Sequence, residues 1–400
     1  MIEGAIFLGG GPMNRSIIER QLERIRKSQD KKQKGTEKEL KREFRRLLSE
    51  LRRVIGEEFS INTNEDKLSY TVLRKNGRAE EFWHKVEATI LLLSLRVPEL
   101  LNDTAYTAYY NSWAGLALAV SETVKPKPYK ALATAFATPT DETMAVALAK
   151  NPYFKDYKQY SKELAKELQK SILRDIKKNL ATGADLSTLS QTVNDRTQKA
   201  FRAVVQASRT TSHTFTEAGL GDAGKGLDEG FKAVKAYSEQ VTKQTERATR
   251  AAETIGERTA KAIKVGRPLP LLEVPPVEAR PGNRGSKVAN FAKTKNIGPA
   301  AKAQLTALDI EEVFIKAETT PKNAQKLPVV QMYKTWRSMR DERVRQTPKA
   351  NHRKMDGVSI PVKERFDLGH GVTTDVPGNS GDPANDARCR CILLYDLREG

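Results

Sequence analysis

Large apolar side chains recur at every fourth position between Tyr160 and Leu180, and this spacing constrains the fold more than any other feature of the sequence. Residues four apart lie on the same face of an α-helix, so the spacing predicts one continuous apolar stripe. The positions are Leu164, Leu168, Ile172, Ile176 and Leu180. Such a stripe has to be buried against another element, so the sequence predicts a packed helical region.

The segment Thr182–Asp185 predicts the end of this helix and the start of another. Gly183 suits the left-handed position that follows many helices. The Asp185 carboxylate can accept hydrogen bonds from the first N–H groups of the next helix. The apolar face then continues through Leu186, Leu189, Val193, Phe201 and Val204.

Two segments are strongly basic. Residues 20–53 hold 14 Lys/Arg and 6 acidic residues, and residues 321–365 hold 12 Lys/Arg and 4 acidic residues. Apolar spacings of three and four in the first segment predict an amphipathic helix, or two helices broken near Gly35. Its charges either form a solvated face or bind DNA phosphates or an acidic protein.

Other stretches predict further elements. We expect glycines 221, 224, 226 and 230 to loosen the chain, and residues 266–285, rich in Pro and Gly, to form a linker. The remaining predicted helices are one from Arg78 to Leu101 that ends near Pro98, a buried aromatic helix at 103–121, a polar helix at 231–264 and a helix at Val329–Val344. The predicted extended segments are a short β-like run at Leu68–Leu73 and strands at Ile310–Ile315 and Cys391–Tyr395.

These patterns predict a mainly α N-terminal and central helical region with a small α+β C-terminal domain. The expected divisions are a basic helical extension (1–57), a helical core region (58–219), a polar helix with a Pro/Gly-rich insertion (220–300) and an α+β domain (301–400).

Composition narrows the class of partner. The 400 residues carry 69 Lys+Arg and 50 Asp+Glu, a net charge of +19, which favours an acidic partner and nucleic acid first. Two cysteines exclude a disulfide scaffold. The first residues include Glu3 where a signal peptide needs Lys or Arg, and no apolar stretch is long enough for a membrane span. We therefore expect an intracellular protein and no membrane partner.

Sequence motifs for nucleotide binding and for hydrolysis are missing. There is no P-loop, no glycine fingerprint between a strand and a helix, no nucleophile elbow and no HExxH. We therefore expect no cofactor and no catalytic residues.

Four residues near the C-terminus offer metal-ligand chemistry, since two imidazoles and two thiols can hold a tetrahedral zinc ion. They are His352, His370, Cys389 and Cys391. Their spacing fits no standard zinc finger, so our first interpretation is that no metal binds. In that interpretation His352 hydrogen-bonds a loop and the cysteines pack as small apolar residues. Redox chemistry of the two thiols is a third option.

Acidic residues gather in the same region, at Asp341, Glu342, Asp356, Asp367, Asp375, Asp382 and Asp386. Most stand beside Gly or Pro, where Asp is a turn residue, so we favour turns. A metal-dependent nuclease or hydrolase that uses His352, His370 and nearby aspartates is the alternative. Trp336 is expected to be a core anchor inside a helix, with the neighbouring arginines as a cationic rim.

The C-terminal motifs occur in a specific order. Trp336 is followed by Asp341 and Arg343-Val344-Arg345, then by His352 and the Asp356-Gly357 pair, then by Gly381-Asp382-Pro383 and finally by Cys389-Arg390-Cys391. This order resembles the signature of the phage Mu F-like head morphogenesis proteins, also called minor head or minor capsid proteins. The helix leading into Ser208-Arg209-Thr210 is similar to that family too. The resemblance covers residues 160–219 and 329–395.

The resemblance implies a structural phage protein without enzymatic activity, with 301–400 as its head-morphogenesis signature domain. It implies a location in the virion, in the head interior or at the portal vertex, and in the host cytoplasm during assembly. The implied partners are the portal protein, the major capsid or scaffold protein, and double-stranded DNA bound without sequence preference. The signature positions are Trp336, Asp341, His352, Asp356, Gly357, Cys389 and Cys391.

Arginines of the two basic segments are the expected contacts to DNA or to an acidic partner. They are Arg42, Arg45, Arg46, Arg52, Arg53, Arg337, Arg340, Arg343 and Arg345. A free-standing DNA-binding protein of the host remains a further hypothesis, which predicts no association with virus particles.

Overall fold

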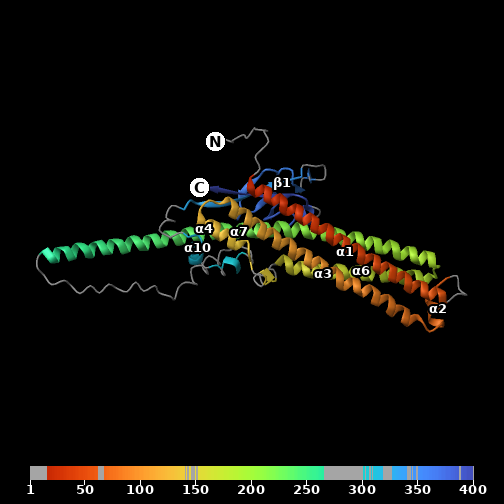
Figure 1. Cartoon of the computed structure of the whole chain (residues 1–400). Coiled ribbons are helices and arrows are strands. Elements are labelled where there is room, and N and C mark those ends of the chain that lie inside the picture. The colour runs from red at the N-terminus through yellow and green to blue at the C-terminus, as the bar shows by residue number, and fades with distance from the viewer. Residues whose placement is uncertain are drawn as a thin grey trace.

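The computed structural model describes residues 16–61, 67–139, 152–264, 310–318, 327–339, 350–386 and 389–399, and isolated residues within 141–149, 301–308 and 344–347. Long helices form an extended bundle, and short strands pack against one side of it (Figure 1). The predicted fold class is confirmed: the chain is mainly α, with a small C-terminal region of antiparallel strands.

Four long helices build the bundle. They are α1 (Ile17–Ile61), α3 (Ala79–Thr123), α6 (Pro152–Thr182) and α7 (Leu186–Lys264). Short helix α2 (Tyr70–Lys75) lies between α1 and α3, and α4 (Lys127–Phe136) and α10 (Ile310–Lys316) pack against α7. Gly183 has a φ of +74° between α6 and α7, and the Thr188 amide donates to the Asp185 carboxylate at 2.7 Å. The predicted boundary at Thr182–Asp185 is confirmed.

The C-terminal strands form one sheet and two hairpins. The sheet is antiparallel in the order β4-β1-β7, from β4 (Ser359–Pro361), β1 (Val330–Arg337) and β7 (Ile392–Glu399). Trp336 on β1 stands opposite Leu393 on β7. The hairpins are β2 (Gln346–Thr347) with β3 (Ala350–Asn351), and β5 (Phe366–Gly369) with β6 (Val372–Thr374); a single turn of helix, α11 (Pro383–Asp386), precedes β7. The strand predicted at Cys391–Tyr395 is confirmed as part of β7.

The buried side chains divide into two clusters along the bundle. One contains residues of the helices and of the isolated bridge between Leu68 and Ala184, among them Phe44, Leu51, Phe82 and Ile176. The other joins the sheet to the bundle and includes Trp113 of α3, Phe231 of α7 and Trp336 of β1. Helices α1, α3 and α7 contribute to both clusters, so they connect the helical end of the molecule to the sheet.

Two predicted elements near the C-terminus have the opposite structure. The helix expected at Val329–Val344 is strand β1, in which Val330, Met332, Lys334 and Trp336 are buried alternately with less buried neighbours. The strand expected at Ile310–Ile315 is helix α10. Its buried positions are Ile310, Val313, Phe314 and Ala317, a helical spacing, while Ile315 is 69% exposed.

Of the two alternatives for residues 20–53, the single helix is confirmed, whereas the helix end predicted near Pro98 is wrong. Helix α1 is continuous through Gly35, because the Gln29 and Gln33 side chains continue the buried face there and the Gln33 amide bonds Ser208 at 3.1 Å. Helix α3 continues through Pro98 to Thr123. Proline in a helix costs about 3 kcal/mol. Burial of Val97, Leu100 and Leu101 on either side outweighs that penalty.

The prediction of a β-like run at Leu68–Leu73 is also wrong. Leu68 forms an isolated bridge to Ala184, and Ser69 then caps helix α2 by accepting the Val72 amide at 3.2 Å. An N-cap serine sets the helix start more strongly here than the β propensity of the residues that follow.

Helix α7 is continuous from Leu186 to Lys264, so the glycines expected to loosen the chain lie inside a helix. They allow close packing instead, because a Cβ at Gly224 would lie 3.0 Å from Val362 and one at Gly226 2.7 Å from Phe136. The polar helix predicted at 231–264 is confirmed as the last part of α7, which projects beyond the bundle with every residue from Glu246 to Arg258 exposed (Figure 1). The linker predicted at 266–285 lies outside the described residues.

None of the described helices combines the length and the apolar content that crossing a membrane requires.

Candidate functional site

Three residues of the expected zinc set converge beside the sheet. His352 follows β3, and Cys389 and Cys391 precede β7. His352 and Cys391 are buried, with 3% and 2% of their surface exposed, and Cys389 is partly buried. We call these three residues the thiol–imidazole cluster. The fourth predicted member, His370, is exposed in the turn between β5 and β6, with a φ of +53°, and it does not join the cluster.

The cluster is compact. The imidazole Nδ1 of His352 lies 3.6 Å from the Cys389 sulfur and 3.6 Å from the Cys391 sulfur. The hydrogen bond to the Cys391 thiol raises the pKa of Cys389 well above its ordinary value, and burial adds to the increase. The Cys389 thiol is therefore protonated at neutral pH when no cation is present.

The opposite edge of the His352 ring, which carries Nε2, is held by buried polar groups. Its Nε2 lies 3.2 Å from the Asn385 side-chain oxygen, and Asn385 has no exposed surface. The Asn385 amide nitrogen donates to the Asp382 carboxylate at 2.6 Å. The Trp336 ring contacts the imidazole edge to face, with ring centres 5.5 Å apart.

The signature pair Asp356-Gly357 fastens a turn to the end of β1. The Asp356 carboxylate accepts the Ser338 amide at 2.9 Å, and the Gly357 amide donates to the Trp336 carbonyl at 2.8 Å. Gly357 has a φ of +86°, which a residue with a side chain rarely adopts. These two residues thus shape the strand end that carries Trp336. Asp341 lies outside the described residues.

The C-terminal strands dock on one part of α7, residues Glu217–Phe231, which we call the docking segment. The buried Glu217 carboxylate accepts the Leu393 amide of β7 at 3.0 Å and pairs with Arg26 of α1 at 3.0 Å. Asp228 accepts the Met332 amide of β1 at 3.1 Å, and Lys363 pairs with both Asp228 and Glu229.

Other polar groups of the docking segment are buried beside the same contact. The Tyr109 hydroxyl of α3 donates to Asp222 at 2.7 Å, and burial raises the pKa values of both groups. No local sequence signal marks Glu217, Asp222 or Asp228 for this role, since acidic residues inside a helical pattern are ordinarily solvent-facing.

Lys334 is a buried cation on β1, with 1% of its surface exposed. Burial lowers its pKa to about 7, partly offset by Asp375, whose backbone oxygen lies 3.0 Å and whose carboxylate lies 3.7 Å from the ammonium nitrogen. Lys225 and Arg365 lower the pKa of Lys334 further, and the ammonium lies over the Phe366 ring.

The aspartates of the nuclease alternative have structural partners. The Asp367 carboxylate accepts the Gly369 amide at 2.8 Å, and Asp386 accepts the Ser380 and Gly381 amides at 2.8 and 2.7 Å. Asp375 pairs with Lys225 at 3.0 Å. Within the described residues, no carboxylate oxygen joins the thiol–imidazole cluster. No observation therefore favours a hydrolytic centre.

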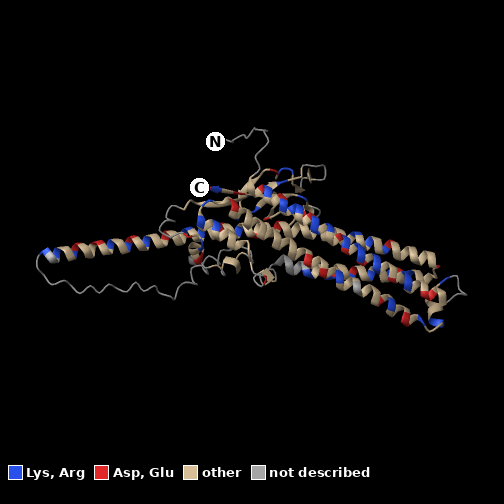
Figure 2. Cartoon of the chain, viewed as in Figure 1, with Lys and Arg blue, Asp and Glu red and all other residues tan. Residues whose placement is uncertain are grey.

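The expected arginine contacts lie on two different parts of the molecule. Arg42, Arg45, Arg46, Arg52 and Arg53 are exposed on α1, beside the helical cluster, whereas Arg337 is half-buried on β1 and 3.9 Å from the Asp356 carboxylate. Arg340, Arg343 and Arg345 lie outside the described residues. Figure 2 shows Lys and Arg spread along the helices with acidic residues between them.

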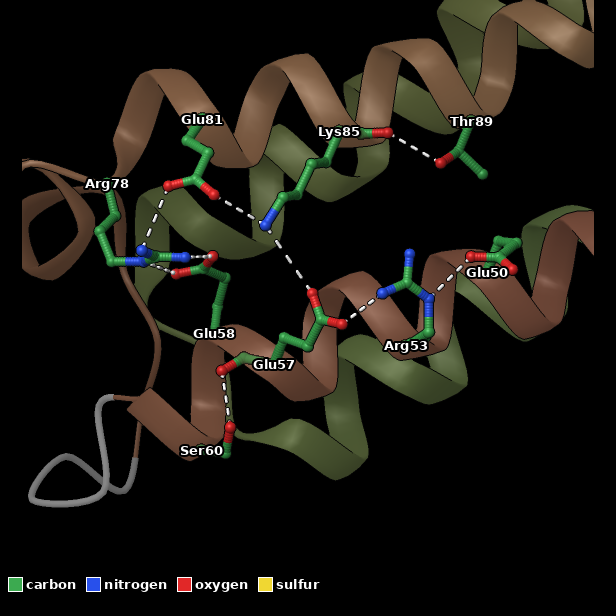
Figure 3. A network of polar contacts seen from close by, with 9 residues as sticks. All are labelled: Glu50, Arg53, Glu57, Glu58, Ser60, Arg78, Glu81, Lys85 and Thr89. Carbon is green, nitrogen blue, oxygen red and sulfur yellow. Dashed lines mark hydrogen bonds and ion pairs between the residues drawn. The ribbon is translucent and has the colours of Figure 1, made fainter.

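The α1 arginines differ in their pairing. Arg53 bonds Glu50 and Glu57 in a network that continues to α3 (Figure 3), and Arg42 has Glu39 and Glu43 within 4.0 Å. Arg45, Arg46 and Arg52 form no ion pair with any residue that the structure describes. Among the five predicted arginine contacts of α1, these three guanidinium groups are therefore the most available to a partner.

Comparison with known proteins gives two matches. Residues 280–394 match a family described as "Phage Mu protein F like protein". Over 149 residues the chain is 30% identical to a protein named "Minor head protein GP7" from Bacillus phage SPP1. That match covers 33% of this chain and 47% of the relative, so the chain spans about half the length of the curated relative it matches. No solved structure matches the chain.

Proposed function

Because residues 280–394 match the phage Mu F-like family and the chain is 30% identical over 149 residues to a minor head protein, we propose that it acts in phage head morphogenesis. The observation that carries the proposal is the agreement between the family match and the ordered C-terminal motifs. In the structure, Trp336, His352, Asp356, Cys389 and Cys391 lie around the end of β1 and the start of β7.

The proposed place of action is the virion, at the portal vertex or in the head interior, after assembly in the host cytoplasm. The proposed partners are the portal protein and the major capsid or scaffold protein. A structural protein needs extended surfaces for such contacts, and the bundle with its projecting α7 offers them (Figure 1). The proposed role requires no enzymatic activity.

We further propose that α1 contacts packaged double-stranded DNA without sequence preference. The net charge of +19 supports this part of the proposal, as do Arg45, Arg46 and Arg52, which form no ion pair within the described part of the chain. Each phosphate that a cation neutralises releases counterions, so such binding weakens steeply as the salt concentration rises. Packaged DNA presents phosphates at high density, and this favours binding that is independent of sequence.

The DNA contact is tested by titrating the full chain with random-sequence duplex DNA at several salt concentrations. Arg45→Gln/Arg46→Gln/Arg52→Gln should reduce the slope of log affinity against log salt by about 1 for each phosphate that is no longer neutralised. The matched control is Arg96→Gln/Lys170→Gln/Lys316→Gln, which removes the same charge from side chains of α3, α6 and α10 that are paired with glutamates on their own helices. Equal reductions in both variants would argue against a specific role of α1.

The assembly role needs a separate measurement. Particles purified from an infection should contain the protein, and particles made without it should have defective heads. Absence of the protein from purified particles would reject the proposal and favour a free-standing DNA-binding protein instead.

A further inference from the structure

We propose that His352, Cys389 and Cys391 bind a zinc ion. The ligand atoms of these three residues lie within 4.8 Å of one another, and no other group of described residues forms such a set. The proposal goes beyond the assembly role, because a metal centre in this chain stands or fails independently of the partner it binds.

The distances fit zinc closely. Zinc lies about 2.3 Å from thiolate sulfur and about 2.0–2.1 Å from imidazole nitrogen, so tetrahedral angles place sulfur and nitrogen roughly 3.5–3.6 Å apart. The two observed separations between His352 Nδ1 and the cysteine sulfurs are both 3.6 Å. Both separations therefore match those expected for one zinc ion bound to the imidazole and to each thiolate.

The donor atoms also select the metal. Two thiols and one imidazole suit zinc, whereas magnesium and calcium prefer oxygen ligands. Hydrogen bonding alone explains the geometry less well. A neutral imidazole has one lone pair, which accepts one S–H group, yet two sulfurs approach the same nitrogen at the same distance.

The surroundings of His352 hold the ring in the state that a metal needs. The Asn385 nitrogen donates to the Asp382 carboxylate, which leaves the Asn385 oxygen facing His352. The proton of the imidazole is then on Nε2, and the lone pair of Nδ1 points at the sulfurs. Metal-binding histidines are commonly oriented by such a second hydrogen bond.

The position of the cluster indicates a structural role for the ion. It would tie the turn after β3 to the segment that leads into β7, beneath the Trp336 ring. A hydrogen bond from α7 also reaches this segment, between His213 and the Cys391 backbone. Small domains with few core residues are often stabilised by a structural metal. The fourth position of a tetrahedral ion would be completed by a ligand other than these three residues.

The first test is elemental analysis of the full chain purified without chelators. We expect zinc and protein in equimolar amounts, and a large loss of zinc in Cys389→Ser and Cys391→Ser. The matched control is His370→Gln, which changes a histidine of the same region outside the cluster and should keep its zinc. Zinc-free wild-type protein in which mass spectrometry shows a Cys389–Cys391 disulfide would overturn the proposal.

A second test does not depend on the folding of cysteine variants. Wild-type protein stripped with a chelator is titrated with Co²⁺, which should produce a thiolate-to-cobalt absorption band that Zn²⁺ removes. Zinc should also raise the melting temperature of the stripped protein. Asn385→Ala should weaken zinc binding about 10–100-fold, because it removes the hydrogen bond that orients His352. The absence of both the absorption band and the change in melting temperature would reject the site.

Discussion

The docking segment of α7 and the network at the far end of the bundle both contain ion pairs between acidic and basic side chains. The two regions differ in how far these side chains are buried. In the docking segment, Glu217, Asp228 and Glu229 are at most 3% exposed and bond the strands. At the far end, Arg53 and Glu81 are exposed, and Glu50, Glu57 and Lys85 are partly exposed. Only Glu58, paired with Arg78, is buried in this network (Figure 3).

The difference shows that burial decides the energetic weight of an ion pair. An exposed pair contributes about 0–1 kcal/mol. Removing one member of a buried pair lowers the free energy of unfolding by several times more, because the remaining charge has neither water nor a counter-charge beside it. The docking segment is therefore expected to control the stability of the contact between sheet and bundle, and the network at the far end mainly keeps that surface solvated.

The largest expected effect is at Glu217. Glu217→Gln removes the charge that balances Arg26 and weakens the bond to the Leu393 amide, so the free energy of unfolding should fall by about 3–5 kcal/mol. Urea denaturation measures the loss. The matched control at the far end is Glu50→Gln, and a similar loss in both variants would remove the distinction between the two regions.

A smaller effect is expected from added methyl groups. A Cβ at Gly219 would lie 2.4 Å from the Tyr109 carbonyl oxygen, and backbone cannot easily move away. Gly219→Ala should therefore destabilise the protein by about 1–3 kcal/mol. At the far end, a Cβ at Gly56 would meet nothing within 4 Å, so Gly56→Ala should stabilise by about 0.5–1 kcal/mol. Thermal denaturation of both variants checks the opposite signs.

The sheet side of the docking contact should show its own pH dependence. Folded Lys334 loses its proton near pH 7, whereas the unfolded chain keeps it until about pH 10.4. The unfolded state binds more protons in this window, so stability should rise with pH, by about 1 kcal/mol between pH 7 and pH 8.

Two variants isolate this contribution of Lys334. In Lys334→Met the increase between pH 7 and pH 8 should disappear. Lys85 at the far end has a pKa raised by its hydrogen bond to Glu81, so it stays protonated throughout the window. Lys85→Met should therefore keep the wild-type slope. An unchanged slope in Lys334→Met would show that the buried lysine does not titrate there.

The smallest effect is expected at Arg53. Its pairs with Glu50 and Glu57 lie on the surface of one helix, and solvent and salt screen them. Arg53→Gln should change the free energy of unfolding by less than about 0.5 kcal/mol, and by less still at high salt. A loss comparable with that of Glu217→Gln would mean that the exposed network is a cooperative unit.

Local patterns predicted the helices well because each helix carries its own periodic apolar face. The apolar residues four positions apart at 164–180 and the helix end at Gly183 could be predicted without knowledge of tertiary contacts. Strand β1 was missed because one of its four buried positions is Lys334, which interrupts the alternation of apolar residues. The glycines of the docking segment were misread because the close approach of Tyr109, Val362 and Phe136 comes from distant parts of the chain.

The candidate site shows the same division. His352, Cys389 and Cys391 could be selected from the sequence, because few residue types hold a metal and two of them stand in a C-x-C pair. Turns and contacts between separate elements decide the rest. They keep His370 out of the thiol–imidazole cluster and give Asn385, Asp382 and Glu217 their roles. Buried polar partners of this kind have no local sequence signal.

The continuity of α7 has a mechanical consequence. With a rise of 1.5 Å per residue, its 79 residues make a rod of roughly 120 Å, and the part beyond the docking segment is roughly 50 Å long. A helix without a break works as a lever about the point where it is held. A tilt of about 10° at the docking segment would move the tip by roughly 9 Å, so a small adjustment between sheet and bundle becomes a large displacement at Lys264.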